Sequence, residues 1–187
     1  METMQNEFGF AGAAGLQASM GGQVAAHVPQ SIWNVQCHDK DGNLKWEDDA
    51  HNMVFDAGIN DLLDKYFKGA AYTAAWFVGL INNTPSYNAA DTMASHAGWT
   101  ENVNYAEATR PALTLGSVAA KSVDNTASKA VFTINGGGGT LAGFFLCSNS
   151  TKSGTTGILY SGVNFTAGAR AFIATDVLSV SATLTGA

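Results

Sequence analysis

Residues 31–47 read SIWNVQCHDKDGNLKWE. Trp33, Val35 and Cys37 alternate with polar neighbours, which is the period of a strand with one buried face. After DKDGN, which holds the Asp-Gly pair of a hairpin turn, the alternation resumes at Leu44 and Trp46. The stretch therefore predicts an antiparallel β-hairpin at the start of the folded domain.

A helix is expected directly after the hairpin, over Asp56–Lys68. Its apolar residues follow the i, i+3, i+4, i+7, i+8 spacing of an amphipathic helix: Ile59, Leu62, Leu63, Tyr66 and Phe67. Asp56 is a suitable N-cap, and Gly69 is well placed to end the helix. The pattern predicts one short amphipathic helix.

The remaining sequence is typical of β-structure, with apolar runs of strand length separated by turns rich in glycine. The expected strands are Ala74–Ile81, Ala112–Ala119, Ala130–Asn135, Leu141–Ser148, Gly157–Val163, Ala171–Ala174 and Val177–Thr183. Residues 31–187 are accordingly predicted to form a single, mainly β domain, an antiparallel β-sandwich or jelly-roll-like fold with one short α-helix.

Residues 1–30 differ from the rest, because they are rich in Gly and Ala and contain no Lys or Arg. Their large apolar residues are too widely spaced to bury one another: Phe8, Phe10, Leu16, Met20 and Val24. Ordering such a segment alone costs much conformational entropy. Two interpretations stay open, a frayed tail and an extended N-terminal arm that orders against a partner, and we favour the arm.

The composition excludes several functions. A net charge of −6 and a pI of about 5.0 argue against nucleic-acid binding, which needs a basic surface. No apolar run is long enough to span a membrane, and the N-terminus lacks the basic region of a signal peptide. Cys37 and Cys147 fit no metal spacing and are expected to be free thiols in a protein made in the cytoplasm. Only 13% of the residues are charged, and a surface with so few ions is easily covered by a neighbouring protein.

No motif predicts chemistry. Asp39-x-Asp41-x-Asn43 has the first spacings of a calcium loop, but Leu44 stands where that loop requires Gly, so a hairpin turn is expected instead. Gly136–Gly139 precedes a strand-like segment, whereas a phosphate loop precedes a helix. Asp48 and Asp49 are expected to be an exposed acidic end of the hairpin. We therefore expect no catalytic residue, no metal and no cofactor, and a protein that is not an enzyme.

The long polar connection from Asn82 to Arg110 carries aromatic residues that are candidates for contacts with a partner: His96, Trp99 and Tyr105. Exposed Trp residues are favoured interface anchors. Trp99 is equally compatible with two other positions, folded back over the edge of the sheet, or exposed as a platform on which a sugar stacks.

Several segments resemble a family of small structural proteins of tailed bacteriophages, described as head decoration (cement) or tail-associated proteins. They are Asn60–Phe67, Ala75–Leu80, Ala90–Glu101, Tyr105, Arg110-Pro111 and Gly143–Leu146. The resemblance extends over Ser31–Ala187 and does not include the N-terminal arm. It implies a virion protein on the capsid surface, with the major capsid protein and copies of itself as partners, and it brings no catalytic residues.

The sequence therefore leads to the expectation of a phage capsid decoration protein that stabilises the head by bridging neighbouring capsid subunits as a homo-oligomer. The arm and the Asn82–Arg110 connection are the expected contact regions. The alternatives are a tail or tail-fibre component and a carbohydrate-binding β-sandwich module that uses Trp99.

Overall fold

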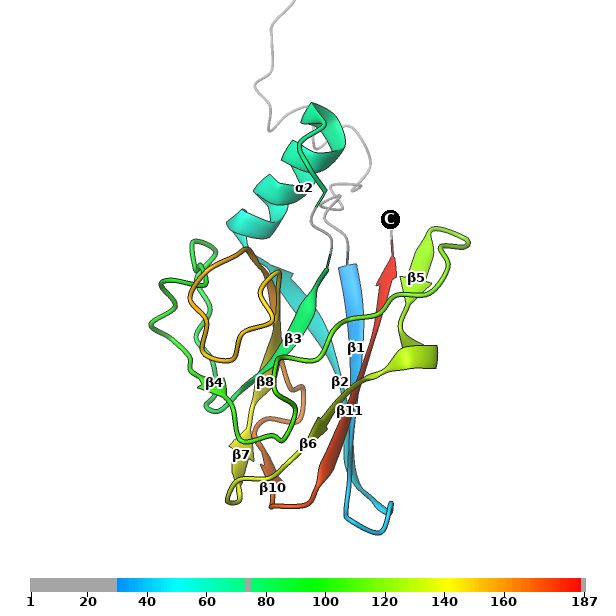
Figure 1. Cartoon of the computed structure of the whole chain (residues 1–187), viewed down its shortest axis with the longest axis vertical. Coiled ribbons are helices and arrows are strands. Elements are labelled where there is room, and N and C mark those ends of the chain that lie inside the picture. Colours follow the sequence, from blue (N-terminus) through cyan, green and yellow to red (C-terminus); the bar gives the residue numbers. More distant parts are fainter. Residues whose placement is uncertain (1–29, 73–74, 186–187) are drawn as a thin grey trace, which may run out of the picture.

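The structure is a computed structural model that describes residues 30–72 and 75–185. Its strands in chain order are β1 Gln30–His38, β2 Leu44–Val54, β3 Phe77–Ile81, β4 Glu101–Asn102, β5 Ser122–Asp124, β6 Ala130–Thr133, β7 Gly139–Leu141, β8 Gly143–Cys147, β9 Leu159–Asn164, β10 Arg170–Phe172 and β11 Val177–Thr185. The helix α2 spans Asp56–Lys68, and a 3-10 turn, η1, spans Thr126–Ser128. The prediction of a mainly β, antiparallel fold with one short helix is confirmed for these residues (Figure 1).

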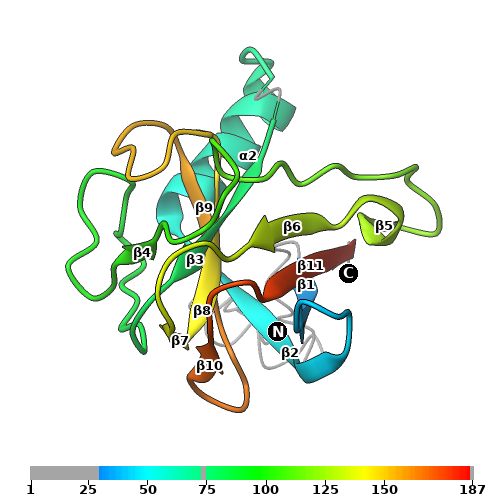
Figure 2. The ribbon, with the colours of Figure 1, turned by 60° about the horizontal axis from the view of Figure 1, so that its bottom comes forward.

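Nine strands form one hydrogen-bonded sheet in the order β4-β3-β8-β9-β2-β1-β11-β5, with β6 paired to β11 beside β5. The long strand β2 belongs to both halves of this sheet, because Leu44–His51 pairs with β1 and Asn52–Val54 pairs with β9. The sheet thereby folds into two layers, β4-β3-β8-β9 and β1-β11-β5-β6, which lie face to face (Figure 2). The structure is thus a β-sandwich, while the jelly-roll alternative stays a prediction.

The inner core lies between these layers. Trp33, Val35 and Cys37 point inward from β1, as their alternation predicts, and are fully buried. Trp33 contacts Phe144 of the opposite layer, with 5.9 Å between ring centroids. The two-stranded sheet β7-β10 closes one end of this core with Phe172.

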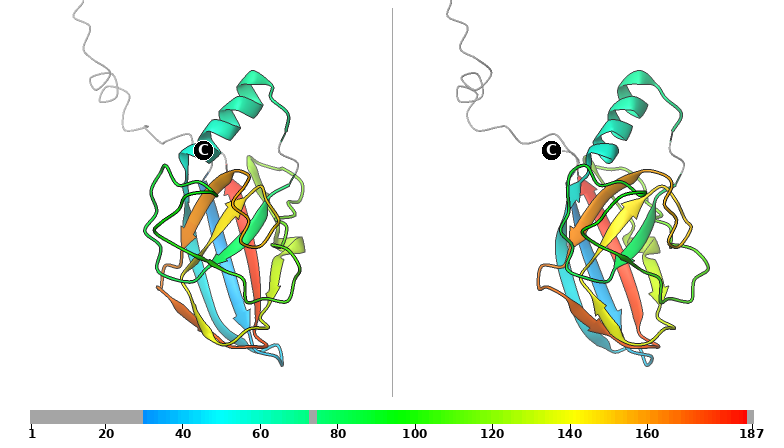
Figure 3. Two further views of the ribbon diagram at one scale, coloured as in Figure 1. Left: turned by 60° about the vertical axis from the view of Figure 1, so that its left-hand side comes forward. Right: turned by 90° about the vertical axis from the view of Figure 1, so that its left-hand side faces the viewer.

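A second core lies on the outer face of β3, β8 and β9. All five residues of β8 are buried, because Phe144 and Leu146 face the inner core while Phe145 and Cys147 face outward. The connection 82–100 covers this outer face and contributes Tyr87, Met93 and Trp99 (Figure 3). A strand that is buried on both faces requires such a cover, since an exposed Phe145 would leave a large apolar area in water.

Three predictions are wrong. Ala112–Ala119 is not a strand, because the chain is exposed after Leu113; the next strand along the chain is β5, which pairs with β11. Asp56 is not the N-cap of α2, since the extended residue Phe55 occupies that position. Asp48 is not exposed: it is buried and accepts hydrogen bonds from the amides of Thr166 and Ala167.

The turn and helix-end predictions are confirmed. Asp39 Oδ1 accepts the amides of Asp41 and Asn43, so this carboxylate shapes the hairpin turn. Gly69 ends α2 in the left-handed conformation, at φ 71°, and donates its N–H to the carbonyl of Asp64. Within residues 30–72 and 75–185, no helix has both the length and the apolar character needed to span a membrane.

The two-core arrangement depends on a glycine in β3. A Cβ at Gly79 would lie 2.2 Å from two ring atoms of Phe145, whose ring is itself packed against Trp99. We expect Gly79→Ala to lower the free energy of unfolding by about 1–3 kcal/mol, because the added methyl group overpacks the outer core. Urea denaturation followed by tryptophan fluorescence measures this change. The control is Gly137→Ala, where nothing lies within 4 Å of the added Cβ and we expect little change; equal effects of both substitutions would contradict the packing argument.

Candidate interaction surface

The helix α2 is attached to the sandwich at its N-terminal end. Phe55, the N-cap, is fully buried in the outer core, and its amide donates to the carbonyl of Tyr160 on β9. Gly58 is the buried residue of the helix, and a Cβ there would lie 2.6 Å from the same carbonyl oxygen. The first turn of α2 thus packs closely against β9, while the following turns extend beyond the end of the sandwich (Figure 3).

The apolar stripe that predicts the helix is largely exposed to solvent. Tyr66 and Phe67 expose 78% and 74% of their surface, and Leu63 is also exposed. The rings of Tyr66 and Phe67 contact each other edge to face, with centroids 4.9 Å apart. We call Leu63, Tyr66 and Phe67 the apolar ridge. Fully burying one such side chain stabilises a protein or complex by about 1.5–3 kcal/mol. A partner that covers the ridge would gain free energy of this size for each buried side chain.

A groove runs between the other side of α2 and the end of the sandwich. Its volume is about 200 Å³, and it is lined by Asp61, Leu62, Lys65, Tyr72, Trp76, Leu113, Leu115, Leu146, Tyr160 and Leu184. Trp76 and Tyr160 meet edge to face at its floor, with centroids 5.1 Å apart. Trp76 is only half-buried, because its ring lines this groove.

The charges of α2 are compensated along the helix. Lys65 pairs with Asp61 at 3.2 Å, and Lys68 pairs with Asp64 at 2.7 Å, both with i, i+4 spacing. These four residues face away from the ridge, since each residue advances about 100° around a helix. The ridge and the groove wall are therefore not dominated by either sign of charge.

The predicted contact residues of the Asn82–Arg110 connection are mostly inside the protein. Trp99 exposes 2% of its surface, stacks on His96 at 3.8 Å between centroids and donates from Nε1 to Asp91. Tyr105 also exposes 2% and carries the Lys152 ammonium over its ring at 3.8 Å. The interpretation that Trp99 folds back over the sheet is thus the one observed. Of the other predicted contact residues, His96 is half-buried, and Phe8, Phe10, Leu16, Met20 and Val24 lie outside the described residues.

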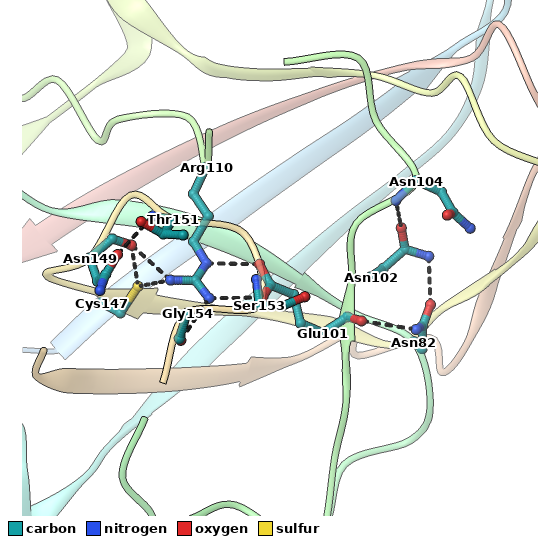
Figure 4. Close-up of polar contacts among 10 residues, drawn as sticks. All are labelled: Asn82, Glu101, Asn102, Asn104, Arg110, Cys147, Asn149, Thr151, Ser153 and Gly154. Atoms are coloured by element: carbon teal, nitrogen blue, oxygen red, sulfur yellow. Dashed lines mark hydrogen bonds and ion pairs between the residues drawn. The ribbon is translucent and has the colours of Figure 1, made fainter. Parts of the chain in front are cut away.

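A buried arginine clamps this connection to the sandwich (Figure 4). Arg110 exposes 1% of its side chain and forms a bidentate ion pair with Glu101, with both N–O distances at 2.8 Å. Its remaining donors reach the carbonyls of Asn149 and Gly154 at 2.8 and 3.2 Å. Glu101 Oε2 in turn accepts the amide of Ser153. Every charged atom of the pair therefore has partners, and the pair joins two loops that are far apart in sequence.

A cavity next to this clamp has a volume of about 290 Å³, and its lining includes Trp99 and Phe145 beside His96, Glu101 and Arg110. Trp99 lines the cavity with only 2% of its surface exposed, and one face of its ring is stacked on His96. The Arg110 and Glu101 charges are already paired with each other. The cavity thus offers neither a flat aromatic platform nor an uncompensated charge.

The two thiols are buried groups of low reactivity. Burial, followed by the nearby Asp176 carboxylate, raises the pKa of Cys37 to about 12. Burial also raises the pKa of Cys147, although the Arg110 guanidinium opposes this shift. Both therefore remain protonated at neutral pH, unlike catalytic thiolates.

In the part of the chain that the structure describes, no group of three or more His, Cys, Asp or Glu residues could hold a metal ion.

Sequence reasoning identified the apolar stripe of α2 without deciding what covers it, and it missed the Arg110–Glu101 pair. The stripe carried a signal, since Tyr66 and Phe67 lie in the last turn before Gly69, where a helix that projects from a domain has no layer to cover it. The ion pair has no sequence signal, because nine positions separate Glu101 from Arg110 within an irregular loop.

Comparison with known proteins found no matching family model and no matching curated protein.

The clamp leads to a stability prediction. Arg110→Met leaves the Glu101 carboxylate buried without its partner, so we expect the free energy of unfolding to fall by about 3–5 kcal/mol. Chemical denaturation at neutral pH measures the loss. The control is Lys40→Met, which removes an exposed ion pair with Asp41 and should cost less than about 1 kcal/mol. A loss as small as that of the control would mean that the buried pair does not hold the loops.

The raised thiol pKa values lead to a pH dependence. Above the ordinary thiol pKa of 9.0 the unfolded chain loses protons that the folded Cys37 retains, so stability present below that pH is lost as the pH rises toward about 12. Burial likewise raises the pKa values of Tyr87 and Tyr105, which adds to the loss above about pH 10. We expect denaturation midpoints to fall between pH 8 and pH 10.5, and to fall less steeply in Cys37→Ala. Parallel pH profiles of the two proteins would contradict the assignment to Cys37.

Proposed function

We propose that the chain is a structural protein of a tailed-phage particle, attached to the outside of the capsid as a decoration protein. The observation that carries this proposal is the apolar ridge of α2, which projects from an otherwise well-packed sandwich. Large exposed apolar groups on a soluble domain mark sites of protein contact. The low charge content of the chain adds support, because few ions would need to be desolvated when a neighbour covers its surface. The resemblance of Ser31–Ala187 to phage structural proteins is the reason for choosing a capsid as the neighbour.

The proposed mechanism is mechanical. The ridge inserts into an apolar depression of the major capsid protein, while the rigid sandwich spans the joint to the next subunit, either directly or through another copy of itself. Burying Leu63, Tyr66 and Phe67 adds binding energy across a joint that internal pressure opens. In this proposal the chain has no catalytic role.

A tail or tail-fibre position is the second candidate, because the same ridge would serve attachment there equally well. The carbohydrate-binding alternative receives no support from Trp99, since that ring is buried and stacked on His96.

The location is tested on purified particles of the phage that encodes the chain. We expect mass spectrometry to detect the chain in hundreds of copies per particle, and electron microscopy to place it on the capsid. A low copy number with density on the tail would favour the second candidate, and absence from the particle would overturn the virion proposal.

The role of the ridge is tested with matched substitutions. We expect Phe67→Asp to weaken binding to particles depleted of the protein at least about tenfold, since a charge replaces an aromatic anchor. Co-sedimentation with the particles measures the bound fraction. Val118→Asp is the control. The exposed fraction of Val118, 76%, is close to that of Phe67, but Val118 lies on the loop before β5, away from α2. Equal binding of the two variants would exclude the ridge as the attachment site.

A further inference from the structure

The groove between α2 and the sandwich lies where the chain enters the domain. Leu184, one of its lining residues, is paired in register with Ser31, and the neighbouring pair joins Thr185 to Gln30. Residues 1–29 are therefore connected to the sandwich beside the groove. In Figure 1 the starts of β1 and α2 and the end of β11 lie at the same end of the sandwich.

We propose that this groove holds apolar side chains of the chain's own segment 1–29. The proposal is independent of the particle attachment, because the groove and the ridge are formed by different residues of α2. Phe67 of the ridge lies about 140° from Leu62 of the groove wall around the helix axis, while Tyr66, four residues after Leu62, lies where the two surfaces adjoin.

The segment is long enough to reach every part of the groove. Val24 is six positions before Gln30, and an extended chain spans at most about 3.3–3.6 Å per residue, which gives Val24 a reach of roughly 20 Å. A helix of 13 residues, such as α2, is itself about 20 Å long. Met20 and Leu16 can reach still further.

The chemistry of the two partners matches. The groove is lined mainly by aliphatic and aromatic side chains, and the Lys65–Asp61 ion pair leaves its charged wall nearly neutral. The segment provides widely spaced apolar residues, no Lys or Arg, and a Gly- and Ala-rich backbone that can approach a surface closely. At about 200 Å³ the groove is smaller than the roughly 300–1,000 Å³ typical of small-molecule sites, a size that favours a few inserted side chains over a separate ligand.

The covalent connection favours the chain's own segment over that of a second copy. A short flexible linker gives a tethered group an effective concentration in the millimolar range. A segment of another molecule would have to be present at a comparable concentration to compete. The second copy is therefore an alternative outcome of the test.

The test uses paramagnetic broadening in the full chain. A nitroxide is attached to Lys68→Cys, which lies on the groove side of α2, while Cys37 and Cys147 are buried and do not compete for the label. We expect the amide NMR signals of the region around Leu16, Met20 and Val24 to lose most of their intensity relative to the reduced label. Because every amide is observed, the readout does not depend on a guessed register.

Substitutions in the groove provide the specificity control. Leu115→Asp and Leu62→Asp place a charge in the groove at partly exposed positions, and each should restore the signals of the segment. Val118→Asp should leave the broadening unchanged, since Val118 does not line the groove. Retained dispersion of the remaining signals shows that each variant is folded.

Three outcomes would overturn the proposal. The first is the absence of broadening in the segment, and the second is broadening that persists in both groove variants. The third is broadening that appears in an isotope-labelled chain without nitroxide when it is mixed with unlabelled, nitroxide-carrying chain, which would identify a second copy as the occupant. Particle binding by the same variants is a separate measurement, so a failure here leaves the role of the ridge unaffected.

Discussion

The double burial of β8 constrains the rest of the structure. Its sequence, Gly-Phe-Phe-Leu-Cys, has no polar side chain on either face, so both faces must be covered. The inner face is covered by β1 and β11 of the opposite layer, and the outer face by the connection 82–100 with Trp99. The fold is therefore a two-layer sandwich with a third, irregular layer of loop.

The irregular layer explains the polar interactions of the protein. A loop that covers a sheet has few backbone hydrogen bonds of its own and must be fixed by side chains. The Arg110–Glu101 pair does this by joining the loop to the Asn149–Gly154 turn, and Asn82 and Asn102 add a second link beside it. The aromatic residues that stand out in the sequence of this loop thus serve its packing, which leaves contact with partners to another part of the molecule.

That other part is α2. The sandwich packs closely against the first turn of α2 through β9 and does not cover the following turns. The helix consequently keeps Leu63, Tyr66 and Phe67 on one side and borders a small apolar groove on the other. The helix α2 therefore borders two apolar surfaces that the sandwich does not cover. The proposals for the ridge and for the groove assign one contact to each.

The sequence by itself determined the elements whose signals are local. The hairpin of residues 31–47, the bounds of α2, its end at Gly69 and most of the strands follow from periodicity and turn residues, because neighbouring positions decide these features. Only the tertiary structure decided which faces are covered. Periodicity identifies an apolar face without its partner, so Trp99 turned out to be buried and the stripe of α2 exposed, and the buried positions of Asp48 and Arg110 depend on loops distant in sequence.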